Sequence, residues 1–259
     1  MAAPFILGWV SPWPYASLSR KAATGTQFMP FIDLLSNADL LALSIYLLAF
    51  VLYGLVADHS PLQRYSISAA MDRQRRNWMH EARRRELRML DSNVLQILMN
   101  GISIFASTNI FVIGGLIAGI AYNEQLSDAF SRVPFAVQIS PALWSLKLAL
   151  LLAVFVYAFF KFAWAIRLAN YCAIMVGALA SHNDAESADA EARTEAAAKL
   201  ASLCAFHFNR GLRANFFGLA ALGWFFSPML FIAGTIFIVL ILVRREFLSG
   251  ALKAVRALK

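Results

Sequence analysis

Long apolar segments without charged residues are the feature that most constrains this chain. The longest of them has no Asp, Glu, Lys or Arg between Asp91 and Glu124. As a helix rising 1.5 Å per residue, it exceeds the hydrocarbon core of a bilayer, which is about 30 Å thick. Only 15% of the 259 residues are charged and 60% are hydrophobic, whereas a soluble domain has about 25% charged residues. This composition excludes a single soluble domain and a disordered chain, and it indicates an integral membrane protein.

Four apolar segments predict four membrane-spanning helices, at about residues 40–57, 97–122, 143–179 and 214–243. The third segment is interrupted only by Lys147, Lys161 and Arg167, and it is longer than a bilayer requires. The fourth contains Pro228 near its middle, which should kink or break the helix. We therefore expect an all-α integral membrane protein, a four-span helical bundle with helices that extend into the cytoplasm.

The chain divides into three regions on this interpretation. Residues 1–35 form an N-terminal extension, residues 36–247 the membrane domain and residues 248–259 a basic C-terminal tail. The extension is a poor candidate for an ordered domain, and Met29 directly precedes a plausible membrane entry. One hypothesis is therefore that translation starts at Met29. The membrane domain opens at Ser36, which with Asp39 has the residue type of a helix N-cap.

The distribution of basic residues predicts the orientation, because Lys and Arg mark the cytoplasmic side. Residues 58–93 hold eight arginines against five acidic residues and should be cytoplasmic, as should residues 181–213, while residues 123–142 suit the outside. This order puts the C-terminus outside, yet the tail from Arg244 onward holds five basic residues and one acidic residue. Either the fourth segment turns back at Ser227–Pro228 or the membrane tolerates the violation. We favour four full spans.

Two segments outside the spans are predicted to be helical. Residues 67–92 are rich in Arg, Glu, Met and Leu and should continue into the second span, and residues 185–205 are rich in alanine. We interpret the arginines of the first segment as a topology signal that contacts lipid headgroups. Nothing else in the chain supports binding to nucleic acid.

A stripe of polar residues follows one face of the second span. Gln96, Asn100, Ser103 and Ser107 have the four-three-four spacing of residues on one side of a helix. Polar groups need hydrogen-bond partners in hydrocarbon, so the stripe must face protein or water. It either forms hydrogen bonds between helices or lines a pore or substrate path. Small residues at Gly115 and Gly119 permit close helix contact nearby.

Lys161 is the cation that lies deepest in a predicted span. A charge buried in the membrane costs roughly 3 kcal/mol or more, so Lys161 either snorkels or faces a wet interior. There it would join the polar path of the second span, hold an anion or pair with a carboxylate such as Asp91. Lys147 and Arg167 lie near the expected membrane edges, where snorkelling suffices. With no acidic residue inside a predicted span, the charge bias weakly favours anions.

The entry to the fourth span reads FHFNRGLRANFF, and it places His207, Arg210 and Arg213 near one helical face. These residues either anchor the helix at the interface or cradle an anion or a lipid phosphate. Gly211 is unfavourable inside a helix, so we expect a close approach of another element there. The sequence contains no grouping typical of a catalytic, metal or cofactor site, and we expect a protein that is not an enzyme.

Four stretches carry a family resemblance: LDSNVLQILMNGISIFASTNIFVIGGL, YAFFKFAWAIRLANYCAIMVGA, HFNRGLRANFFGLAALGWF and VRREF. In these stretches, over most of Asp33–Phe247, the chain resembles a bacterial membrane family catalogued as domain of unknown function 599. The resemblance implies a multi-pass, four-span protein of the bacterial inner membrane. It carries no activity and assigns no functional residue.

These observations lead to two functional hypotheses. The first is a homo-oligomeric channel or transporter, with anions slightly favoured, because four spans are few for a monomeric transporter. The second is a non-transporting structural or accessory subunit that binds another membrane complex or lipid. Both assume the lipid bilayer as the immediate partner, and neither requires a cofactor.

Overall fold

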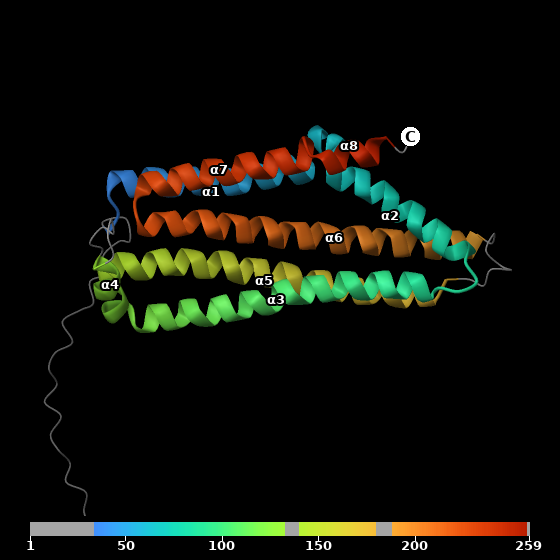
Figure 1. Cartoon of the computed structure of the whole chain (residues 1–259), viewed down its shortest axis with the longest axis horizontal. Coiled ribbons are helices and arrows are strands. Elements are labelled where there is room, and N and C mark those ends of the chain that lie inside the picture. Colours follow the sequence, from blue (N-terminus) through green and yellow to red (C-terminus); the bar gives the residue numbers. More distant parts are fainter. Residues whose placement is uncertain (1–33, 133–139, 180–187, 258–259) are drawn as a thin grey trace, which may run out of the picture.

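The computed structural model describes residues 34–132, 140–179 and 188–257, and these residues contain helices and no strand (Figure 1). The α-helices are α1 (Asn37–His59), α2 (Ile67–Arg84), α3 (Met89–Ala121), α4 (Asn123–Ser131), α5 (Pro141–Gly177), α6 (Ala188–Leu222), α7 (Pro228–Phe247) and α8 (Gly250–Arg256). Short 3-10 helices include η2 (Pro61–Tyr65) and η4 (Gly223–Phe225).

Four of these helical segments are long and apolar enough to cross a membrane, which confirms the predicted all-α class with four long apolar helices. They are α1, α3, α5 and the segment Pro228–Arg256, which contains α7. The helix α6 runs along the bundle between α5 and the pair formed by α1 and α7 (Figure 1). The helix α6 is not one of the four apolar segments because its polar residues lower its mean hydropathy. Neighbouring helices cover much of its surface.

The predicted fourth span is divided between two helices. The helix α6 ends at Leu222, the chain turns through η4, and α7 runs back antiparallel to α6 (Figure 1). Ser227 caps α7, because its hydroxyl accepts the Leu230 N–H at 3.0 Å. Pro228 starts this helix instead of kinking one, since a first-turn residue needs no intrahelical N–H bond. A Cβ on Gly223 would lie 2.9 Å from the Leu230 carbonyl oxygen, so the tight turn requires glycine there.

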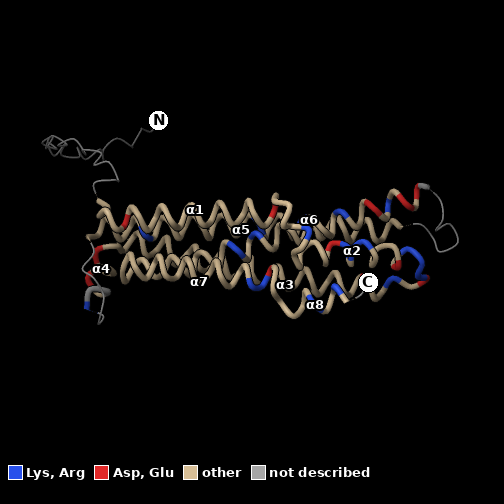
Figure 2. Tube along the Cα trace, turned by 90° about the horizontal axis from the view of Figure 1, so that it is seen from above, with Lys and Arg blue, Asp and Glu red and all other residues tan. Residues whose placement is uncertain are grey.

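This turn brings the basic tail to the end of the bundle that holds the arginine-rich helix α2 (Figure 2). We call this the basic end, and the end with η4 and α4 the opposite end. Arg256 of α8 donates to the Tyr65 carbonyl oxygen at 2.5 Å, which joins the tail to η2. The conflict between the charge of the tail and its predicted side thus disappears, because two helices replace one between α5 and the tail.

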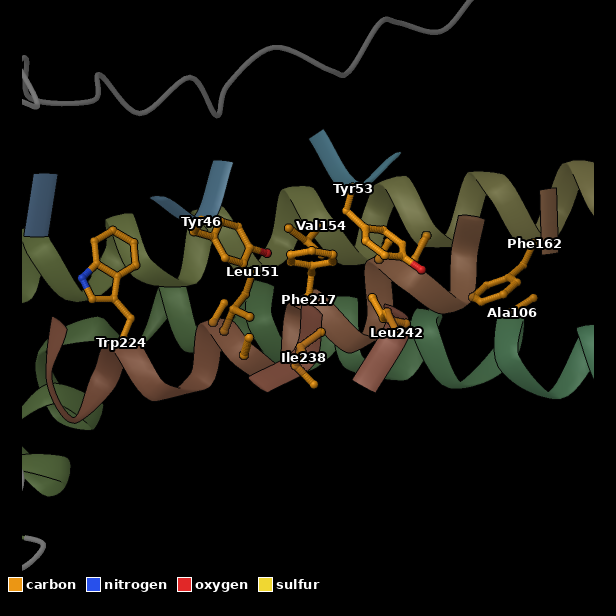
Figure 3. Close-up of a cluster of buried hydrophobic side chains, with 14 of the residues drawn as sticks. Tyr46, Tyr53, Ala106, Leu151, Val154, Phe162, Phe217, Trp224, Ile238 and Leu242 are labelled. Carbon is orange, nitrogen blue, oxygen red and sulfur yellow. The ribbon is translucent and has the colours of Figure 1, made fainter. Parts of the chain in front are cut away.

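Aromatic side chains join α1, α6 and α7 in the main hydrophobic core (Figure 3). The Tyr46 ring of α1 packs edge-on against Phe217, at 5.7 Å between centroids, and lies at a tilt of 39° against Phe231, at 4.9 Å. Phe231 in turn stacks on Trp224 at 5.2 Å. Burial of such large rings, with favourable edge-to-face geometry, stabilises the contact between these three helices.

Small residues allow α5 and α6 to approach closely. A Cβ on Gly211 would lie 2.5 Å from Phe162, and one on Gly218 would lie 2.9 Å from Phe155. Both distances are shorter than a van der Waals contact, so any larger residue would push the helices apart. The close approach expected at Gly211 is therefore confirmed.

A second, smaller core holds the helices together at the basic end. It contains Met79 of α2, Leu95 of α3, Cys172 and Val176 of α5, and Ala197, Ala198 and Ala201 of α6. The predicted continuous helix from residue 67 into the second span is wrong, because α2 ends at Arg84 and α3 begins at Met89. The break lets α2 fold back and place Met79 on α6.

Candidate functional site

The polar stripe of α3 lies on the outer side of the bundle. Gln96, Asn100 and Ser107 are exposed, and Ser103 is half-buried. The helix packs mainly against α5, and it has the smallest share of buried residues among the four spans. The stripe therefore faces away from the protomer, toward whatever surrounds α3 in the membrane.

The hydrogen bonds of this stripe stay within α3. The Gln96 amide donates to Asn100 Oδ1 at 2.8 Å, and the Ser103 hydroxyl donates to the Met99 carbonyl oxygen at 2.9 Å. Among the described residues, no hydrogen bond joins the stripe to another helix. Interhelical bonding inside one protomer thus does not account for these polar groups.

Glycines continue the outward face of α3 beyond the stripe. A Cβ on Gly114 or Gly115 would meet nothing within 4 Å, whereas one on Gly119 would lie 3.1 Å from Leu148 of α5. Gly119 therefore serves packing inside the protomer. Gly114 and Gly115 leave an open strip of backbone that another helix could approach.

Lys161 lies on another side of the bundle from the stripe. Its ammonium sits 5.0 Å from the centre of the Tyr157 ring and within electrostatic range of His207 and Arg210 of α6. The prediction that Lys161 could pair with Asp91 is wrong, because the Asp91 carboxylate accepts hydrogen bonds from Trp78 at 2.7 Å and Arg85 at 2.5 Å. Within the protomer, no described contact joins Lys161 to the stripe.

The predicted anion cradle contains an internal counter-ion. Asp58 at the end of α1 accepts from Arg210 Nε at 2.7 Å and from Arg213 through both oxygens at 2.6 and 2.8 Å. This fork of two arginines on a buried carboxylate ties α1 to α6, since charge-assisted bonds of this kind are strong. His207 of the cradle keeps a buried Nδ1 with no hydrogen-bond partner among the described residues. The structure thus brings Arg210 and Arg213 together, but around Asp58.

A buried polar group around Lys147, missed in the sequence, lies at the opposite end. Lys147 does not snorkel: it is buried, and its ammonium donates to the Trp224 carbonyl oxygen at 2.7 Å. The Trp224 indole donates to Asp39 at 2.7 Å, and Asp39 forms the capping box with Ser36. The N-cap prediction for Ser36 is confirmed. No local spacing could have indicated that Lys147 meets a turn 77 residues away.

At the basic end, His80 of α2 meets two carboxylates of α6. His80 Nε2 lies 3.2 Å from Glu195, and Nδ1 lies 3.9 Å from Glu191, so three metal-ligating groups gather there. Arginines already occupy both acids, since Arg83 pairs with Glu191 and Arg76 lies 3.4 Å from Glu195. The cluster therefore acts as an ion-pair network that fastens α2 to α6.

Comparison with known proteins gives one match. No curated protein and no solved structure matches the chain. The family model described as "Protein of unknown function, DUF599" matches residues 41–251, which include α1 through the first residues of α8. This match agrees with the resemblance carried by the second, third and fourth spans, and the chain is a member of the DUF599 family.

Proposed function

We propose that this protein is a homo-oligomeric membrane channel or transporter, and that the α3 stripe of Gln96, Asn100, Ser103 and Ser107 lines a polar path shared between copies. The observation that carries the proposal is the exposure of two amides, Gln96 and Asn100, on the outer face of α3, a helix that is long and apolar enough to span a membrane. A second copy or water must satisfy these groups, because lipid tails offer no hydrogen bonds.

The position of α3 supports an arrangement of several copies. The helix sits at the edge of the bundle with α5 on one side, so its free side is available along the full span (Figure 1). Amides carry both donors and acceptors, and the same stripe on a second copy is therefore a complementary partner. A closed ring would give each copy one stripe toward a common axis.

The proposal also includes a preference for anions, and Lys161 is the residue that supports it. This cation lies near His207 and Arg210, so the region between α5 and α6 is positive apart from Asp58. The stripe itself is neutral and gives no sign of charge selection. We further propose the bacterial inner membrane as the location, with the basic end in the cytoplasm, as the positive-inside rule favours.

Ion flux into proteoliposomes tests the proposal. The wild-type chain should conduct anions above the level of empty liposomes, and a Gln96→Leu/Asn100→Leu variant should lose most of that flux. The matched control is Thr108→Val, because Thr108 is also exposed on α3 but donates to the Ile104 carbonyl oxygen outside the stripe. Flux of anions and cations equal to empty liposomes would overturn the channel proposal.

Oligomeric state gives an independent check. Replacement of Cys172 and Cys204 by Ala, followed by Asn100→Cys, leaves one thiol on the stripe. Oxidation should cross-link this variant between copies, whereas Leu41→Cys on the outer side of α1 should cross-link far less. A chain that stays monomeric in nanodiscs would contradict a shared path.

A second candidate is the non-transporting accessory subunit, which the open backbone at Gly114 and Gly115 favours. Small residues of this kind admit a close helix of another membrane protein. Gly115→Leu should then block assembly with that partner. In a shared-path oligomer, the same variant should separate the copies and abolish flux.

A further inference from the structure

A cavity of about 480 Å³ lies at the basic end, where the apolar spans leave the membrane. Its walls come from the end of α1, η2, α2, the middle of α6 and the end of α7. Leu203, Phe206 and three alanines provide an apolar part, while the rest is polar or charged. The cavity is separate from the α3 stripe, so its role is independent of the proposed transport.

Cations outnumber carboxylates in this cavity. Arg64, Arg75, Lys199, Arg213 and Arg245 line it together with Asp58, Asp72 and Glu246. Asp58 is already saturated by Arg210 and Arg213, and Glu246 accepts the Ser68 N–H at 3.3 Å. The five cations therefore exceed the three carboxylates by two formal charges.

Three cations of the cavity have no ion pair among the described residues. Arg64 and Arg245 contact aromatic rings, at 4.8 Å from Tyr65 and 5.3 Å from Phe216, and Lys199 contacts no carboxylate among the described residues. A fourth cation, Arg75, lies 3.8 Å from Asp72, which is a weak pair. Burial lowers the pKa of this Arg75 guanidinium, with Asp72 opposing the shift. An anion in the cavity would supply the missing counter-charge.

A second cavity of about 180 Å³, lined by apolar side chains together with His59 and Arg210, adjoins the basic one and shares Asp58 and Arg213 with it. Phe50, Val51, Leu55 and Phe217 line it, so it follows α1 into the membrane. A basic cavity at headgroup level that continues into an apolar cavity matches the two parts of a phospholipid.

We propose that the two cavities together bind one anionic phospholipid, with its phosphate among Arg64, Arg75, Lys199 and Arg245 and an acyl chain beside α1. Lipid is favoured over a soluble phosphate because the apolar cavity opens from the basic one inside the membrane-spanning part of α1. Arg213 contributes charge while remaining tied to Asp58. The proposed phosphate site therefore differs from the cradle predicted from the sequence: the cavity cations replace His207 and Arg210.

Lipid titration of the purified full chain tests this proposal. Dioleoyl phosphatidylglycerol, added to detergent micelles, should raise the melting temperature and bind with saturation in native mass spectrometry. Dioleoyl phosphatidylcholine should do so at much higher concentration. Equal binding of the two lipids by the wild-type chain would overturn the proposal, and this comparison needs no variant.

Matched variants locate the site. Lys199→Gln/Arg245→Gln should weaken phosphatidylglycerol binding by at least about tenfold, because hydrogen bonds between charged groups are strong. The control Arg244→Gln/Lys253→Gln removes the same charge from exposed positions outside the cavity. Equal losses in the two variants would show general surface attraction and overturn the site.

Soluble phosphates test whether the cavity binds the phosphate of a lipid headgroup or a free phosphate. Inorganic phosphate and glycerol 3-phosphate at millimolar concentration should compete weakly with the lipid. If either soluble probe raised the melting temperature as much as phosphatidylglycerol, and Lys199→Gln/Arg245→Gln removed that effect, the cavity would be a soluble-phosphate site and the lipid proposal would fail.

Discussion

The Lys147 ammonium donates a 2.7 Å hydrogen bond to the backbone carbonyl oxygen of Trp224, and this bond fastens α5 to the turn between α6 and α7. The same ammonium lies 5.3 Å from the centre of the Trp224 ring. Asp39 completes the group by accepting from the indole. One buried cation thus joins α1, α5 and the turn that reverses the chain.

Replacement of Lys147 by Met should destabilise the fold. Lys147 is 4% exposed, so the variant leaves the Trp224 carbonyl oxygen without its donor and removes the buried cation that acts electrostatically on Asp39. Loss of the donor to a buried acceptor costs about 1 to 3 kcal/mol. Thermal unfolding in detergent should show a clear decrease in melting temperature. Lys161→Met is the control, because Lys161 is half-exposed and has no ion pair among the described residues.

Replacement of Asp58 by Ala should have a similar effect at the basic end. Arg210 and Arg213 would lose their shared carboxylate, which is 7% exposed, and two partly buried cations would repel each other. We expect a loss of about 3 to 5 kcal/mol. Glu81→Ala removes an exposed partner of Arg84 and should change stability by less than about 1 kcal/mol. If both variants melted alike, the fork would not hold α1 on α6.

The helical elements could be predicted from the sequence because their signals are local. Uncharged apolar runs located α1, α3 and α5, and the Ser36 cap marked the start of α1. Gly211 also indicated its own role, since an interior glycine needs a packing reason. The direction of the polar stripe could not be predicted, because its spacing selects a face of α3 but not the neighbour of that face.

The turn at the opposite end was the less favoured of the two alternatives that the sequence left open, for a physical reason. Residues 223–227 read GWFFS. The three aromatic residues make this segment look like part of an apolar helix, although its glycine and serine permit a turn. Trp224 and Phe225 are buried, so their apolar character reflects packing in the core. The Lys147–Trp224 hydrogen bond and the ion pairs of Asp58 depend on tertiary packing, which is why sequence spacing does not reveal them.

Replacement of Gly211 by Ala should separate α5 from α6. The new Cβ would lie 2.5 Å from the Phe162 ring, and a ring that is fully buried has little room to move. Overpacking of this kind costs about 1 to 3 kcal/mol. Gly54→Ala is the matched control: its Cβ would meet nothing within 4 Å, and alanine favours the helix.

A double variant identifies the cause of that loss. Phe162→Leu in the Gly211→Ala background should recover part of the melting temperature, because the smaller side chain removes the overlap. On the wild-type background, Phe162→Leu alone should destabilise the protein. Additive losses in the double variant would contradict a direct Gly211–Phe162 contact.

The reversal of the chain at η4 predicts which residues share one side of the membrane. Arg73 of α2 and Lys253 of α8 lie at the basic end, and Glu124 of α4 lies at the opposite end (Figures 1 and 2). Single cysteines at these exposed positions, in a chain with Cys172 and Cys204 replaced by Ala, allow labelling with a membrane-impermeant maleimide. In intact spheroplasts, the reagent should label the Glu124→Cys variant, and it should reach Arg73→Cys and Lys253→Cys only after lysis. Labelling of Lys253→Cys together with Glu124→Cys would mean that α6 and α7 cross as one helix, because a single crossing after α5 leaves the tail on the side of α4.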